Sequence, residues 1–118
     1  MVTRYSQDDR RKQLEELLES LDNLCRHLKN TDLFPEMLNV YISRKLDVAS
    51  LLKTSFSQSE LSKLSRDIPD IYNRHKDWLP PLEQSHGKLR EPDWFVELEA
   101  CLQPVLKNAQ LLRELGFY

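Results

Sequence analysis

Glycine is nearly absent from this chain of 118 residues, which contains only Gly87 and Gly116. A phosphate-binding loop needs several closely spaced glycines, because the backbone must approach the phosphate without side chains in the way. The serines Ser55, Ser57 and Ser59 also lack the flanking glycines of a nucleophile elbow. The sequence therefore excludes a glycine-rich nucleotide site and this class of hydrolase site.

Cysteine and histidine are also scarce. The two cysteines, Cys25 and Cys101, fall on apolar faces, and the three histidines, His27, His75 and His86, are scattered along the chain. None of the three histidines forms an obvious metal-ligand pair with a residue at a helical spacing. We therefore expect no metal and no cofactor, and we expect reduced, buried thiols as in a cytosolic protein.

Long hydrophobic runs are missing as well. No uninterrupted apolar stretch approaches the roughly 20 residues that a membrane span requires. The first nine residues contain no apolar run like that of a signal peptide. The sequence therefore predicts a cytoplasmic protein that does not bind membranes.

An excess of charge of one sign is absent too, because the formal net charge is −2 and acids alternate with bases. The most basic segment, Arg10-Arg11-Lys12, is followed by acids and has no interleaved aromatic residues. We interpret it as a solvated face of a helix and expect no nucleic-acid binding.

The composition that remains is 40% hydrophobic and 31% charged, which is typical of a globular helical protein. Four amphipathic stretches predict a single helical domain over residues 1–118. The fold class that we predict is all-α, a four-helix up-and-down bundle with one long connection between helices three and four. A three-helix core with helix four as an arm is the alternative.

Local signals predict where the first two helices begin and end. Ser6, followed three residues later by Asp9, resembles a capping box and opens a helix over about 7–29. A second helix begins at Pro35 and runs to about Thr54. Its apolar arc is unusually wide, so this helix either lies centrally or leaves apolar surface for a partner.

The third helix begins with the capping box Ser57-Gln58-Ser59-Glu60. Pro69 interrupts its apolar pattern, and we favour one kinked helix continuing to Leu79 over two short ones. Residues 80–91 show no periodicity, and such a connection is long for neighbouring helices in a bundle.

The fourth helix lies within Glu91–Tyr118. Its apolar period continues past Pro104, where we expect a kink instead of an end. Gly116 is predicted to stop the helix in a left-handed conformation, with Phe117 packing back on Leu112.

No catalytic pattern remains, so we expect a non-enzymatic protein-interaction module that binds another protein or itself. Tryptophan and tyrosine are enriched in binding hot spots. Trp78 and Trp94 flank the long connection, and Met37 and Tyr41 lie on the wide apolar arc of the second helix. These four are the candidate partner-binding residues.

The alternative function is a bundle with an internal pocket, opened near Pro104, for a small apolar ligand or modest acid–base chemistry. His75 is its candidate polar group, together with Tyr41 or Tyr72. An enclosed pocket containing His75 would favour this alternative over the interaction module.

Overall fold

Four helices make up most of the part of the chain that the structure describes. The structure is a computed structural model, and it describes residues 3–32, 34–69, 83–85, 88–90, 93–114 and 116–117. The helices are α1 (Gln7–Thr31), α2 (Pro35–Leu52), α3 (Gln58–Asp67) and α5 (Asp93–Leu111). The prediction of an all-α fold class is confirmed.

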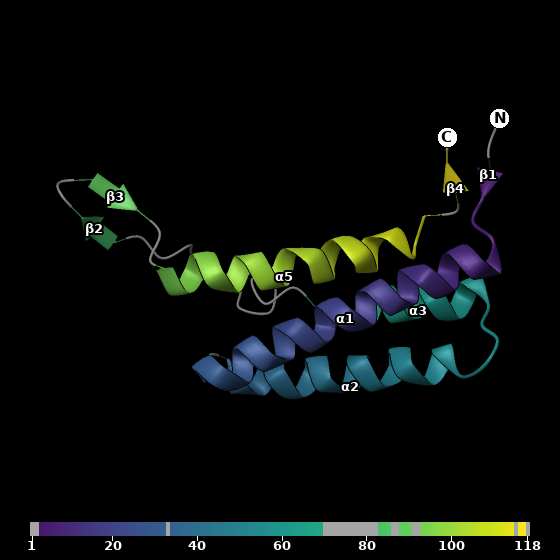
Figure 1. The fold of residues 1–118 in the computed structure, drawn as a ribbon, viewed down its shortest axis with the longest axis horizontal. Coiled ribbons are helices and arrows are strands. Elements are labelled where there is room, and N and C mark those ends of the chain that lie inside the picture. Colours follow the sequence, from purple (N-terminus) through teal and green to yellow (C-terminus); the bar gives the residue numbers. More distant parts are fainter. Residues whose placement is uncertain are drawn as a thin grey trace.

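Helix α1 is the centre of the packing, with α2 on one side of it and α5 on the other (Figure 1). The shorter α3 contacts both α2 and α5. The reason is the heptad pattern of α1, whose leucines face inward over almost the whole helix. The apolar residues that α1 buries are Leu14, Leu17, Leu21, Leu24, Cys25 and Leu28.

The capping box at the start of α1 is formed as predicted. The Oγ of Ser6 accepts from the Asp9 amide at 3.1 Å, and the Asp9 carboxylate accepts from the Ser6 amide at 3.0 Å. These reciprocal bonds occupy two donors that a helix start would otherwise leave unpaired. At the other end, Asp32 has a left-handed φ of 56° and terminates the helix.

Helix α2 begins differently, because no side chain caps it. Its first residue is Pro35, and the N-cap residue Phe34 is left-handed with a φ of 48°. A positive φ is costly for a bulky residue. The backbone of the short α1–α2 connection is therefore strained at Phe34, whose side chain packs on the core.

Helix α3 is shorter than we predicted. Its capping box is present, with the Glu60 amide donating to Ser57 Oγ at 3.2 Å. The helix ends at Asp67, and Ile68 is extended with a ψ of 111°. The residue before a proline is pushed away from helical angles, so the helix stops instead of continuing through Pro69 with a kink.

Helix α5 continues through Pro104, as predicted, but ends at Leu111 and not at Gly116. Gly116–Phe117 forms the short strand β4 and pairs antiparallel with β1 (Thr3–Arg4). The prediction that the helix ends at Gly116 is therefore wrong. The partner strand lies at the other end of the chain, so this pairing could not be predicted from the residues around Gly116 alone.

A second short strand pair lies in the connection that showed no periodicity. Strand β2 (Glu83–Ser85) pairs antiparallel with β3 (Lys88–Arg90). His86 and Gly87, which separate the two strands in the sequence, lie outside the described residues. The rest of the predicted third helix after Pro69 lies outside the described residues.

Two arginines tie the helix ends together where α1 begins, and this corrects our interpretation of a solvated basic face. Arg10 is 4% exposed, and it donates to the Leu111 carbonyl at 3.0 Å and also to the Glu114 carbonyl. Arg11 donates to the Leu52 carbonyl at 2.7 Å. A cation near the C-terminal carbonyls of a helix is favoured by the helix dipole, so these bonds stabilise the ends of α5 and α2.

Candidate functional site

The predicted partner-binding residues are distributed between the core and the surface. Met37 and Tyr41 are buried, and the Tyr41 hydroxyl donates to the Pro69 carbonyl at 2.6 Å. Trp94 is 38% exposed and makes an edge-to-face contact with the buried Phe95. Met37 and Tyr41 therefore belong to the core of this chain and do not form part of its outer surface.

Three other candidate residues lie outside the part of the chain that the structure describes. They are Trp78, His75 and Tyr72. Their roles in partner binding or in an internal pocket stay predictions.

The exposed apolar surface of α2 lies on a different row of side chains from Met37 and Tyr41. Leu38 is half-buried, Ile42 is 38% exposed and Leu46 is 63% exposed. Residues four apart lie one above another on the same face of a helix. Leu38, Ile42 and Leu46 therefore form one continuous apolar row, which we call the α2 ridge.

All three residues belong to the wide apolar arc of the second helix, but none of them is among the predicted binding residues. A wide arc does not reveal which of its members face the core. The spacing of the α2 ridge was a usable signal, because three large aliphatic residues follow one another at intervals of four.

A groove separates α1 from α2 next to the α2 ridge. Leu18 contributes apolar surface to it, and the charged residues Glu15, Glu19, Asp22 and Lys45 complete the lining. Leu18 is half-buried and packs on the core, so its exposed part faces this groove. We call it the α1–α2 groove.

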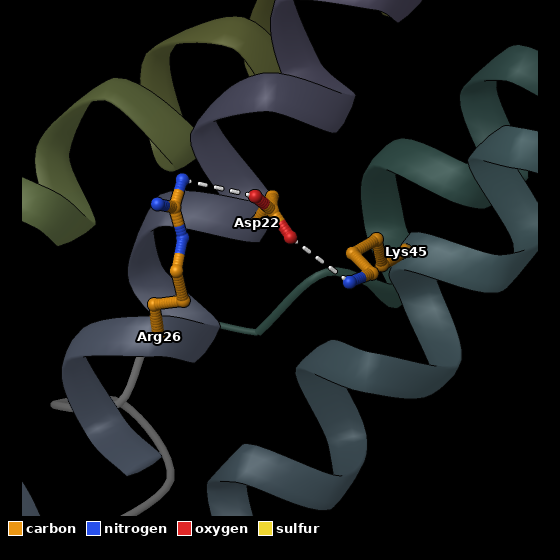
Figure 2. A network of polar contacts seen from close by, with 3 residues as sticks. All are labelled: Asp22, Arg26 and Lys45. Atoms are coloured by element: carbon orange, nitrogen blue, oxygen red, sulfur yellow. Dashed lines mark hydrogen bonds and ion pairs between the residues drawn. The ribbon is translucent and has the colours of Figure 1, made fainter. Parts of the chain in front are cut away.

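Asp22 and Lys45, which both line the α1–α2 groove, belong to a small charge network with Arg26 (Figure 2). The Asp22 carboxylate lies between Arg26 on its own helix and Lys45 on α2, and accepts from them at 3.0 Å and 3.1 Å. The hydrogen bond from Lys45 is the main cause that lowers the pKa of Asp22 below its ordinary value. The network links α1 to α2 and keeps Asp22 ionised.

A second depression lies between α1 and α5, close to Pro104 as the alternative function requires. It is open to solvent and has a mainly polar lining, which consists of Glu16, Glu19, Ser20, Asn23, Cys101, Pro104 and Asn108. The Asn108 amide crosses it and donates to Ser20 Oγ at 3.3 Å. This depression is a surface groove with a bridging amide, and its shape is not that of an enclosed apolar pocket.

The cysteines are free thiols, Cys25 in the core and Cys101 at the edge of the α1–α5 depression. Burial raises the pKa of both thiols, and Glu97 adds to the effect at Cys101. A raised pKa keeps a thiol protonated and unreactive at neutral pH. Within the described ranges, no three residues of the metal-binding types gather into a possible ion site.

Comparisons with known proteins found no relative of this chain. No protein-family model, no curated protein and no solved structure matches it. Among the described helices, none combines the length and the apolar character needed to cross a membrane.

Proposed function

We propose that this chain is a non-enzymatic protein-interaction module whose binding surface includes the α2 ridge. The observation that supports the proposal most strongly is the exposure of Ile42 and Leu46 in one apolar row. Single exposed apolar residues are ordinary, whereas a contiguous apolar surface marks interaction sites. The half-buried Leu38 extends this row toward the start of α2.

The buried polar groups also support an interaction module over an enzyme. Ser65 donates its hydroxyl proton to the Ala109 carbonyl at 2.5 Å, which joins α3 to α5. Arg10 and Tyr41 likewise bond to backbone carbonyls of other segments. These polar side chains hold segments together, whereas a catalytic site needs polar groups aimed into a cavity.

The proposal includes the finer architecture and the location of the module. We propose a single-domain up-and-down four-helix bundle with a long connection between α3 and α5. We also propose a cytoplasmic location, which the free thiols of Cys25 and Cys101 support, since paired cysteines are typical of oxidising compartments. The partner is another protein or a second copy of this chain, and neither nucleic acid nor a membrane.

Sizing in solution combined with affinity capture from an extract of the native cell tests this proposal. The unaltered chain is expected to form a dimer or to retain a partner. Leu46→Ser is expected to weaken either association while leaving the fold intact, because Leu46 is already exposed. A strictly monomeric chain that retains no partner would contradict the proposal.

A further inference from the structure

Three of the four acidic residues in the middle of α1 form no ion pair with another described residue. Between Lys12 and Arg26, the helix carries Glu15, Glu16, Glu19 and Asp22 and no basic residue. Asp22 pairs with Arg26 and Lys45, whereas Glu15, Glu16 and Glu19 take part in none of the ion pairs that the described residues form. Glu15 and Glu19 are also four residues apart, a spacing at which like charges repel.

These unpaired acids border an apolar surface. Glu15 and Glu19 line the α1–α2 groove together with Leu18. Across the groove, Lys45 lies three residues after Ile42, a spacing that puts these two residues on the same side of α2. The α1–α2 groove therefore adjoins the α2 ridge at Ile42, with an acidic border on the α1 side and an apolar row on the α2 side.

From this charge pattern, we infer that the face binds a cationic amphipathic helix of another protein. The aliphatic side chains of such a helix would cover Leu18, Ile42 and Leu46. Its lysines or arginines would pair with Glu15 and Glu19, the two groove carboxylates that form no ion pair with another described residue. A helix laid into an apolar groove is a common mode of peptide recognition, and the charges would fix its orientation. This inference rests on the proposed function and specifies its partner.

A second copy of this chain fits the face less well. A two-fold dimer would place the α2 ridge of one copy against that of the other. Each long side of α2 would then face one of two surfaces of the other copy. One is the acidic border on its α1, and the other is the side of its α2 that carries Asp47. The first arrangement brings acids toward acids, which opposes association, whereas in the second Asp47 already pairs with Arg44 at 3.2 Å.

The test uses the full chain and a synthetic probe helix of leucine and lysine, about 18 residues long so that it can form a stable helix. A matched probe carries glutamate in place of every lysine. Binding is measured by fluorescence anisotropy of the labelled probe, and the contact surface is mapped by amide chemical shifts. We expect the lysine probe to bind at least tenfold more tightly than the glutamate probe, with shifts concentrated at residues 15–22 and 38–46.

Two charge-reversal variants separate this face from general electrostatic attraction. Glu15→Lys with Glu19→Lys is expected to reverse the preference, so that the glutamate probe binds more tightly. Glu97→Lys with Glu99→Lys makes the same change in net charge on α5 and is expected to leave the preference unchanged. Leu46→Ser is expected to weaken binding of the lysine probe about tenfold, and Val96→Ser, an exposed apolar residue on α5, is the matched control.

Several results would overturn the inference. Failure of the lysine probe to bind, shifts confined to other surfaces, or equal effects of the two charge-reversal variants would each do so. If the probe fails but the chain dimerises through Leu46, the cationic partner is wrong and the interaction module stands. If the probe fails and the chain is a monomer that retains no partner from the native extract, both proposals are wrong.

Discussion

At the scale of single residues, Arg10 donates more side-chain hydrogen bonds than any other residue in the part of the chain that the structure describes. Its guanidinium donates to Gln13 at 2.8 Å, to Gln58 at 2.9 Å and to the Leu111 carbonyl at 3.0 Å. It also lies 4.6 Å from the centre of the Tyr5 ring. Burial lowers the pKa of Arg10, but an arginine starts so high that it stays charged.

Replacing Arg10 therefore leaves backbone carbonyl oxygens and side-chain amide oxygens from three segments without a donor. We expect Arg10→Ala to lower the free energy of unfolding by about 3 kcal/mol, since hydrogen bonds to charged groups are the stronger class. Urea denaturation measures this loss. Lys12→Ala, two residues along on the exposed side of the same helix, should change stability by less than about 0.5 kcal/mol. Equal losses in the two variants would show that the bonds of Arg10 are not the cause.

The ionisation of Asp22 gives a second prediction for single residues. Its folded pKa is lowered from 3.8, mainly by the hydrogen bond from Lys45. The stabilisation from this ion pair is therefore present above the unfolded pKa and is lost as the pH falls through the folded pKa. We expect Lys45→Ala to raise the pKa of Asp22 toward its ordinary value, and Arg26→Ala to raise it less.

Carboxyl carbon chemical shifts, followed by NMR through an acid titration, report the pKa of Asp22 directly. A larger rise in Arg26→Ala than in Lys45→Ala would contradict the assignment of Lys45 as the main partner.

At the scale of the helices, α1 and α3 carry reciprocal side-chain caps at their first turns, whereas α2 begins without a side-chain cap. The cap on α3 is important because the helix is short, spanning Gln58–Asp67. A short helix gains little from its own backbone bonds, so its ends and its packing determine whether it forms.

We expect Ser57→Ala to lower the free energy of unfolding by about 1 kcal/mol, because the amide of Glu60 loses its acceptor. Ser59→Ala is the matched control, since Ser59 is exposed in the first turn and does not occupy the cap position. Thermal and urea unfolding of both variants measure the difference. A loss at Ser59 as large as that at Ser57 would contradict the role of the cap.

Helix starts were predictable from the sequence, whereas the ends of the third and fourth helices were not. Each capping box is a local pattern of four residues, so Ser6 and Ser57 marked the starts of α1 and α3 correctly. The end of α5 depends on distant residues, because Arg10 donates a hydrogen bond to the Leu111 carbonyl and β1 pairs with Gly116–Phe117. A glycine near the end of an apolar pattern could not reveal these contacts.

The candidate site was predictable only at the level of the helix. The wide apolar arc of α2 predicted either a central helix or apolar surface left for a partner, and did not say which of its residues face the core. Met37 and Tyr41 face inward, while Ile42 and Leu46 face outward. Which side chains face the core depends on how α2 is rotated about its own axis against α1 and α3. The sequence pattern does not determine this rotation.

At the scale of the whole molecule, α1 is the element that α2 and α5 share, and the two ends of the chain meet through β1 and β4 (Figure 1). Elements with the most buried apolar contacts open last. We therefore expect amide hydrogens at residues 14–28 of α1 to exchange most slowly, and hydrogen exchange measured by NMR tests this. Faster exchange there than in α3 would contradict the central role of α1.

The central claim is that the outer face of α2 binds another protein while the inner faces of the helices hold the fold. Site-specific photo-cross-linking in the native cell tests it most directly, with the cross-linker placed at Leu46 or, as a control, at the exposed Lys63 of α3. The account predicts a discrete adduct of higher mass from position 46 and little or none from position 63. The absence of an adduct at position 46, or equal adducts at both positions, would contradict it.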